Sequence, residues 1–269
     1  MRKKSTATCE NHFGRTVTII QFYRWGPVIA GLLLLSLIGL ALQYATTSGI
    51  ISPFVVPPPA DILQAIPKLF IKEGLIGYFF VTVGITLSAT LISIVIGLPI
   101  GWVLFRSPDF GKAYESWLGA IFSAPIILLY PLFLVVLGRG VTTIIVMSVV
   151  VGITPIILST YTGLKGVPPV YLRVARSFNM ASRDIFWQVY APAAIPAIFT
   201  GVRLALIYVM INAVAMEFLI SIGGLGYLVG DLYDRYNLPE MYAAVIFVVV
   251  ASIIFFTIID RTEKWLRRR

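Results

Sequence analysis

The sequence predicts an all-α membrane protein whose chain crosses the bilayer six times. Hydrophobic residues make up 58% of the chain, charged residues make up 12%, and the mean hydropathy is +0.92. A soluble domain carries about 25% charged residues. The apolar residues are gathered into six runs, each near the ~20 residues that a helix needs to span a membrane. The runs cover residues 27–45, 79–104, 116–137, 141–162, 193–222 and 241–260.

The basic residues predict that both termini lie in the cytoplasm. With that orientation, 16 of the 21 Lys and Arg residues are cytoplasmic, four are external, and Arg203 lies inside the fifth run. This bias satisfies the positive-inside rule. The net charge of +9 is then explained by topology and anionic lipid headgroups. Since the basic residues are divided among four segments, we expect lipids and no nucleic acid as partners.

This topology divides the chain into three parts. Residues 1–25 form a cytoplasmic tail, for which an interfacial helix and a partly ordered segment are both open. Residues 26–261 form the transmembrane domain, and residues 262–269 form a basic cytoplasmic tail. Cys9 and His12 are the only cysteine and histidine. We therefore expect no internal disulfide, no metal site and no Ser-His-Asp catalytic set.

A polar, basic segment over residues 166–191 separates the fourth run from the fifth. Its first part predicts a short amphipathic helix that begins at Pro168–Pro169, where proline is tolerated. Val170, Val174 and Phe178 recur at i, i+4 and i+8 and would form one apolar face.

The second part of this segment predicts another short helix. Ser182 would be its N-cap, and Asp184 would lie in its first turn, where the helix dipole favours a negative charge. Its apolar face would consist of Ile185, Phe186, Val189 and Tyr190. Further on, the run from Gly223 to Tyr227 predicts a tight turn at the outer end of the fifth span.

Several side chains within the runs are candidates for a polar path through the membrane. Glu217 is the foremost, because an ionisable residue inside a span is a functional candidate by default. Asn212, Tyr208 and Tyr130 are further candidates. For each, helix packing or a hydrogen bond to a neighbouring helix is the alternative. We expect Arg203 to extend toward the cytoplasm. Kinks that could line a cavity are predicted by Pro99, Pro125, Pro131 and Pro155.

The polar segment resembles the cytoplasmic coupling loop of ABC importer permeases. In that family, Glu-Ala-Ala is followed by Gly four residues on, Ile ten further and Pro three further. The matching positions here are Arg173, Val174, Ala175, Asn179, Val189 and Pro192. Ala175 and Pro192 match strictly. Asn179 replaces the glycine, and Asn is the best substitute where a left-handed backbone is needed.

The resemblance extends over about residues 50–260 and is to permeases of the taurine, sulfonate and nitrate branch. The segments that carry it are Phe54–Pro59, Thr82–Gly101, Ala124–Pro125, Thr162–Val167, Ala191–Pro196, Gly201–Arg203, Glu217 and Gly224–Tyr227. Leu137–Gly140 departs from the family, because it lacks the aromatic residue before the glycine.

The resemblance implies a type I, MetI-like permease fold in the bacterial cytoplasmic (inner) membrane. It also implies a second permease chain, expected to be identical, two cytoplasmic ATPases that carry ATP and Mg, and an extracytoplasmic binding protein. This chain contains no phosphate-loop motif, so it would hold no cofactor and be non-catalytic. The solute would be sulfonate-, taurine- or nitrate-like, or a vitamin precursor. The residues implied in ATPase coupling are Arg173, Val174, Ala175, Arg176, Phe178, Asn179, Arg183 and Pro192.

The main alternative is a secondary transporter or channel that works without an ATPase. Such proteins are often built from internal repeats, and no convincing repeat relates residues 27–137 to residues 141–260. A membrane enzyme is less favoured, since Asp231, Asp234 and Glu240 are the only acidic cluster. They predict a solvated external loop that could touch a binding protein.

Overall fold

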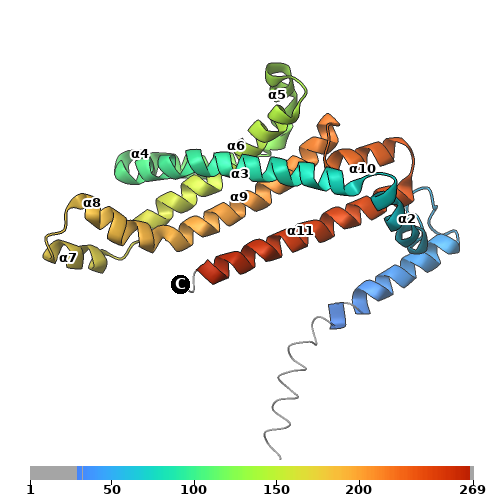
Figure 1. Cartoon of the computed structure of the whole chain (residues 1–269), viewed down its shortest axis with the longest axis horizontal. Coiled ribbons are helices and arrows are strands. Elements are labelled where there is room, and N and C mark those ends of the chain that lie inside the picture. Colours follow the sequence, from blue (N-terminus) through green and yellow to red (C-terminus); the bar gives the residue numbers. More distant parts are fainter. Residues whose placement is uncertain (1–28, 32, 267–269) are drawn as a thin grey trace, which may run out of the picture. The chain divides into compact units, whose positions relative to one another are not determined.

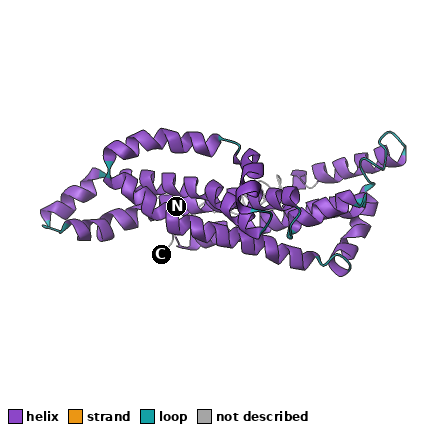
Figure 2. Cartoon of the chain, turned by 90° about the horizontal axis from the view of Figure 1, so that it is seen from above, coloured by secondary structure: helices purple, strands orange, loops and turns teal. Residues whose placement is uncertain are grey.

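The computed structural model describes residues 29–31 and 33–266, and every regular element within them is helical (Figures 1 and 2). The chain divides into two compact units, one up to Gln64 and one from Ala65 onward. The first contains the helix Ile29–Thr47 and the start of α2 (Pro59–Ile71). The predicted N-terminal tail over 1–25, with Cys9 and His12, lies outside the described residues, as do the last three residues of the predicted basic tail.

The second unit contains the long helices of the fold. Its elements after α2 are α3 (Leu75–Arg106), α4 (Pro108–Ser123), a 3-10 turn (Ile126–Leu129), α5 (Tyr130–Leu137), α6 (Val141–Lys165), α7 (Pro169–Ser177), α8 (Ser182–Ile185), a π-helical turn (Phe186–Tyr190), α9 (Ala191–Ile220), α10 (Leu225–Asp234) and α11 (Leu238–Leu266). Figure 1 shows α3, α6 and α9 side by side, with α7 and α8 beyond one end of them.

Within the described residues, five helices are long and apolar enough to cross a membrane, and six if the bent pair α4–α5 counts as one span. The predicted third span, 116–137, is therefore not one straight helix. Its two halves meet at 78°. The break falls at Pro125, which has no N–H for a helical hydrogen bond and whose ring clashes with the preceding turn.

Small residues allow α6 to pack closely against its two neighbours. A Cβ added at Gly101 of α3 would lie 2.6 Å from Cβ of Thr160, and one at Gly201 of α9 would lie 2.4 Å from Cβ of Ser159. Helices in a membrane gain stability from such close approach, since lipid offers no hydrophobic driving force between them. An apolar core lies where the three helices meet, and its buried members are Ile85, Ile144, Met147, Ala213, Met216 and Ile220.

Two charged regions can be compared with what the sequence predicts. The guanidinium of Arg203 lies 2.8 Å from Oδ1 of Asp260 and 3.7 Å from Oε2 of Glu263, so it joins α9 to the last turns of α11. The prediction of a solvated external loop with Asp231, Asp234 and Glu240 is wrong in one respect, because the helix α10 includes Asp231 and Asp234. Glu240 is buried at the start of α11.

Candidate functional site

The helix α7 presents an apolar face that no other part of residues 29–31 and 33–266 covers. It begins at Pro169 after the N-cap Pro168, as the sequence predicts. Val170 and Val174 are half exposed, and Phe178 is 76% exposed, whereas Ala175 is 3% exposed and faces the protein. Large apolar side chains gathered on one exposed face indicate an interaction surface.

The chain leaves α7 through a Schellman motif. The N–H of Asn179 donates to the carbonyl of Arg176, and the N–H of Met180 donates to the carbonyl of Ala175, with N–O distances of 3.0 and 3.3 Å. The motif needs a left-handed residue after the C-cap, and Asn179 has φ 50°. The prediction that Asn179 replaces a left-handed glycine is confirmed.

The second loop helix differs from its prediction. Ala181, not Ser182, precedes the first helical residue, and α8 continues through the π-helical turn into α9. The sequence predicts a short second helix followed by the fifth apolar run, which begins beside Pro192. In the structure, Pro192 lies in the first turn of α9, where proline is tolerated. The wider π-helical turn ends at Tyr190, directly before the first residue of α9. The loop is therefore joined to α9 by continuous helix.

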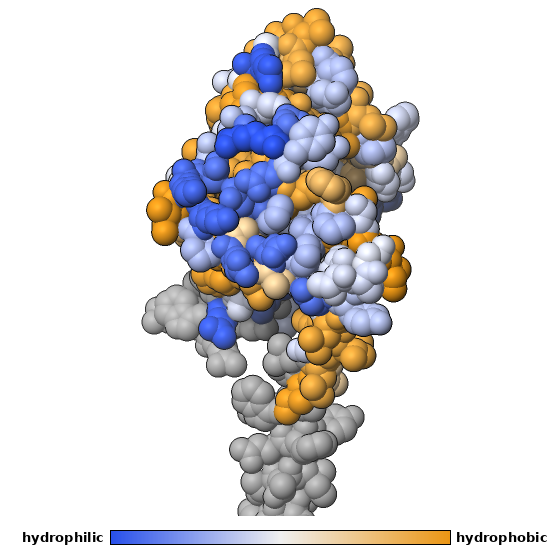
Figure 3. Space-filling model, turned by 90° about the vertical axis from the view of Figure 1, so that its right-hand side faces the viewer, coloured by the Kyte–Doolittle hydropathy of each residue, from blue (hydrophilic) through white to orange (hydrophobic). Residues whose placement is uncertain are grey.

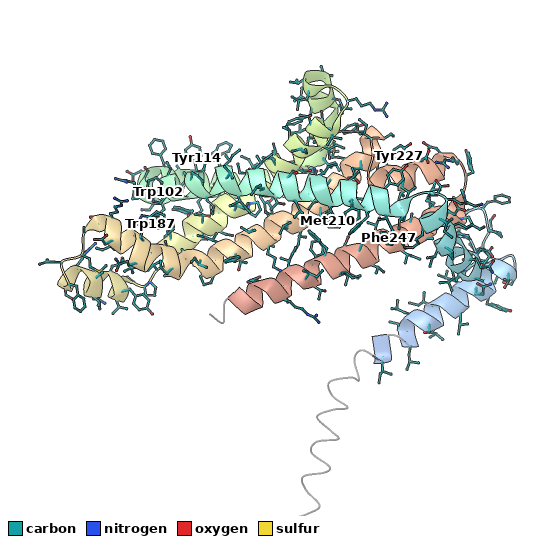
Figure 4. The ribbon with its side chains drawn as sticks, viewed as in Figure 1. Trp102, Tyr114, Trp187, Met210, Tyr227 and Phe247 are labelled. Atoms are coloured by element: carbon teal, nitrogen blue, oxygen red, sulfur yellow. The ribbon has the colours of Figure 1, made fainter. Side chains whose placement is uncertain are left out.

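Between α7 and this continuous helix lies a groove of about 520 Å³. Its lining includes Val174, Phe178 and Pro192 among the predicted coupling residues, and Ala175 forms part of its floor. Trp187, which Figure 4 labels at this end of the molecule, is also exposed. The predicted coupling arginines are all exposed: Arg173, Arg176 and Arg183.

Glu217 is fully buried and holds three helices together. Its Oε2 accepts hydrogen bonds from the Thr82 hydroxyl of α3 at 2.9 Å and from the Gly226 N–H of α10 at 3.0 Å. The Thr82 hydroxyl oxygen in turn accepts from the Leu225 N–H at 2.8 Å. The carboxylate thus lies at the N-terminus of α10, where the helix dipole favours a negative charge. We call these four residues the Glu217 clamp.

Two glycines allow the start of α10 to approach Glu217 and α9 closely. A Cβ at Gly224 would lie 2.2 Å from the carboxyl carbon of Glu217, and one at Gly226 would lie 2.0 Å from the carbonyl oxygen of Val214. Gly224 also has φ 92°, which favours glycine. The predicted tight turn is present after α9. It ends earlier than predicted, since α10 already begins at Leu225.

Tyr208 and Asn212 line a cavity at the break between α4 and α5. The cavity measures about 280 Å³ and is lined by residues from the break, by Val151 of α6 and by residues of α9. Asn212 is buried, and its amide nitrogen donates to Oγ of Ser148 at 3.1 Å. The Tyr208 ring meets the Phe122 ring edge to face at a centroid distance of 4.8 Å. Met210, between these two residues on α9, lies midway along the bundle (Figure 4).

Comparison with known proteins decides the family. Residues 89–269 match the family described as binding-protein-dependent transport system inner membrane component. The chain belongs to this family. It is 28% identical over 246 residues to a probable ABC transporter permease protein of Haemophilus influenzae, a match that covers 88% of this chain and 95% of that protein. It is 29% identical over 191 residues to the taurine transport system permease protein TauC of Escherichia coli, covering 68% of each chain.

Solved structures agree in fold. The chain matches the methionine ABC transporter MetNI in an inward-facing conformation with a TM-score of 0.62 and 21% identity, covering 74% of this chain and 97% of the matched chain. The predicted type I, MetI-like permease fold is confirmed. This chain is the permease subunit of an ATP-driven importer and a component of the inner membrane. ABC transporter partners, an ATPase and a binding protein, are implied by this membership.

The permease brings the predicted site residues together in three places. Four of the coupling residues line the α7 groove and the other four lie elsewhere on the same loop. Tyr208 and Asn212 lie in the cavity, and Glu217 lies in its clamp. Tyr130 is elsewhere, packed against the apolar core. Sequence reasoning missed Phe122 as a cavity residue, although the kink predicted at Pro125 was a signal for the cavity. It also missed Arg139, whose Nε donates to the carbonyl of Ile220 at 2.6 Å and caps α9.

Proposed function

We propose that two copies of this permease form the pathway and that one cytoplasmic ATPase subunit docks on residues 166–191 of each copy. The ATPases hold ATP and Mg, and the permease supplies no catalytic group. Both termini and the α7–α8 loop face the cytoplasm. The turn between α10 and α11 faces the extracytoplasmic binding protein.

The observation that carries this proposal is the exposed apolar groove beside α7. Phe178 and Val174 would insert into the ATPase as apolar anchors, because large side chains in fully desolvated pockets contribute most to binding. Arg173, Arg176 and Arg183 are exposed on the same loop and would add positive charge to the docking surface. Since an arginine stands where related loops have a glutamate, we expect an acidic residue on the ATPase opposite Arg173.

The continuous helix from α8 to α9 suggests how ATP closure reaches the pathway. When the two ATPases close, they displace the two α7–α8 loops. The displacement passes into α9, which carries Tyr208, Asn212 and Glu217. The solute pathway would thereby alternate between inward- and outward-facing states. The binding protein would deliver the solute from outside.

The docking is tested by Arg176→Glu and Phe178→Asp. We expect either change to reduce ATP-driven uptake at least about tenfold, the effect of losing one interface anchor, while insertion into the membrane stays normal. ATPase co-purification and uptake are the measurements. Lys112→Glu is the matched control, because it makes the same charge change at an exposed position of α4 outside the loop. Normal uptake in both loop variants would refute the docking assignment.

The solute is a small molecule whose class the relatives leave open. They include permeases named for taurine, nitrate and formylaminopyrimidine. The competing possibility, a transporter that works without an ATPase, predicts that uptake persists when the ATPase gene is deleted. Our proposal predicts that uptake is then lost.

A further inference from the structure

We propose that the cavity at the α4–α5 break is a solute-binding site and that it takes a small, uncharged, planar heteroaromatic molecule. This inference rests on the proposed function, because it assigns one solute-binding site to the proposed pathway. It narrows the solute to one chemical class.

The position and size of the cavity suit a transported solute. It lies where α4 breaks at Pro125, and broken membrane helices commonly surround binding sites near the middle of the bilayer. Its volume of about 280 Å³ is below the roughly 300–1,000 Å³ of sites for drug-sized ligands. A single ring with one or two substituents would fit such a space.

The walls of the cavity favour a flat ring. Phe122 and Tyr208 stand at 81° to each other, so one presents its edge to the other's face. Tyr208 remains 39% exposed within the chain, which leaves part of its ring available. Aromatic rings prefer such edge-to-face and offset neighbours, and each such pair contributes about 0.5–1.5 kcal/mol beyond its buried area.

The single amide in the cavity favours a ring that carries both a hydrogen-bond donor and an acceptor. Ser148 occupies one N–H of the Asn212 amide, which fixes the orientation of the group. An amide has a second N–H and a carbonyl oxygen. These two groups can pair with a ring nitrogen and an adjacent amino group, as they do when asparagine reads the edge of a base.

The charges of the permease favour an uncharged solute. Among the described residues that line the cavity, none is charged. Glu217 is enclosed in its clamp, and Arg203 is paired with Asp260. Nitrate or a sulfonate would lose its hydration in the cavity without gaining an opposite charge, which is costly in a low-dielectric site.

The test is equilibrium binding of radiolabelled cytosine to the complete transporter, permease with its ATPase, in lipid nanodiscs. Cytosine is a neutral heteroaromatic probe with an adjacent ring nitrogen and amino group. We expect saturable binding that excess nitrate and taurine do not displace. Asn212→Leu should weaken it about tenfold, as the loss of hydrogen bonds predicts. Tyr208→Phe should keep binding, whereas Tyr208→Ala should lose it.

Thr257→Leu is the matched control, because it replaces an exposed polar side chain of α11 whose hydroxyl donates to the Ile253 carbonyl of its own helix and which does not line the cavity. Binding by this variant should stay within about threefold of the parent. The inference is overturned if cytosine does not bind, if nitrate or taurine displaces it, or if Thr257→Leu loses as much binding as Asn212→Leu. Co-purification of the ATPase in each preparation separates this failure from failure of the proposed function.

Discussion

The Glu217 carboxylate closes the turn between α9 and α10 from the inside. Loss of its oxygens would leave the Gly226 N–H buried without an acceptor and would leave the Thr82 hydroxyl only the Tyr78 carbonyl, at 3.3 Å. Leaving a buried polar group unsatisfied costs about 1–3 kcal/mol. The structural role of Glu217 thus follows from its two donors and does not require contact with solute.

This role predicts different outcomes for two substitutions. Glu217→Ala should lower the thermal unfolding temperature of the purified permease by several degrees, since 1 kcal/mol corresponds to about 2–4 °C in a chain of this size. Glu217→Gln should fold nearly normally, because its amide oxygen can accept the same bonds. A Glu217→Gln variant that is fully stable but inactive in uptake would instead assign Glu217 to the pathway.

At this scale, sequence reasoning identified residues better than their partners. An acidic residue within an apolar run marks Glu217 as special. Its donor Thr82 lies 135 positions away in the sequence, and nothing local indicates that α3 and α9 bring the two side chains together. Tyr208 and Asn212 were similarly found as candidates, whereas Phe122 belongs to the cavity only because α4 breaks and turns.

At the scale of an element, the end of α7 sets the geometry of the docking surface. Asn179 in the left-handed conformation turns the chain so that α8 returns beside α7 and completes the groove. The loop pattern predicted this conformation, because the family's glycine and this asparagine are the residues that adopt it readily.

The cap therefore predicts a graded series at Asn179. Asn179→Gly should preserve ATPase binding and uptake. Asn179→Val should weaken both, because a β-branched residue pays about 1–2 kcal/mol or more in the left-handed region. Co-purification of the ATPase at increasing salt would measure the effect. Equal binding by the valine and glycine variants would mean that the Schellman motif does not fix the groove.

The helix boundaries show where sequence reasoning fails at this scale. Apolar runs located α3, α6, α9 and α11, because each must cover a bilayer. Two prolines show this limit: the kink predicted at Pro125 is a full break of 78° within a run expected to be one span, whereas Pro192, at the start of the fifth run, follows a π-helical turn that keeps the helix continuous. Tertiary packing decides whether a proline breaks its helix, and the hydrophobic pattern of the sequence does not reveal that packing.

At the scale of the whole molecule, the second unit has two chemically different ends. The arginines of the coupling loop lie at one end, and the turn between α10 and α11 lies at the other (Figure 1). Figure 3 views the latter end and shows hydrophilic side chains gathered there, with hydrophobic ones around them. Tyr236 in this turn is 88% exposed. Such ends suit the two aqueous faces of a membrane.

The proposed orientation is tested with single cysteines in a Cys9→Ser background. A membrane-impermeant maleimide should label Tyr236→Cys in spheroplasts and Phe178→Cys only in inverted vesicles freed of ATPase. Both side chains are well exposed, so accessibility within the chain does not limit either reaction. Labelling of Phe178→Cys in sealed spheroplasts would reverse the topology.

The π-helical turn between α8 and α9 also fixes the angle, about the helix axis, between the docking loop and the cavity-lining face of α9. A regular α-helix advances 100° per residue, so one residue more or less in this turn would rotate the docking loop by about that angle relative to the cavity-lining face of α9. Transplanting the loop from another permease would therefore succeed only when the angle between the docking loop and α9 is kept. Compatibility between permeases and foreign ATPases becomes a matter of helical register as much as of surface chemistry.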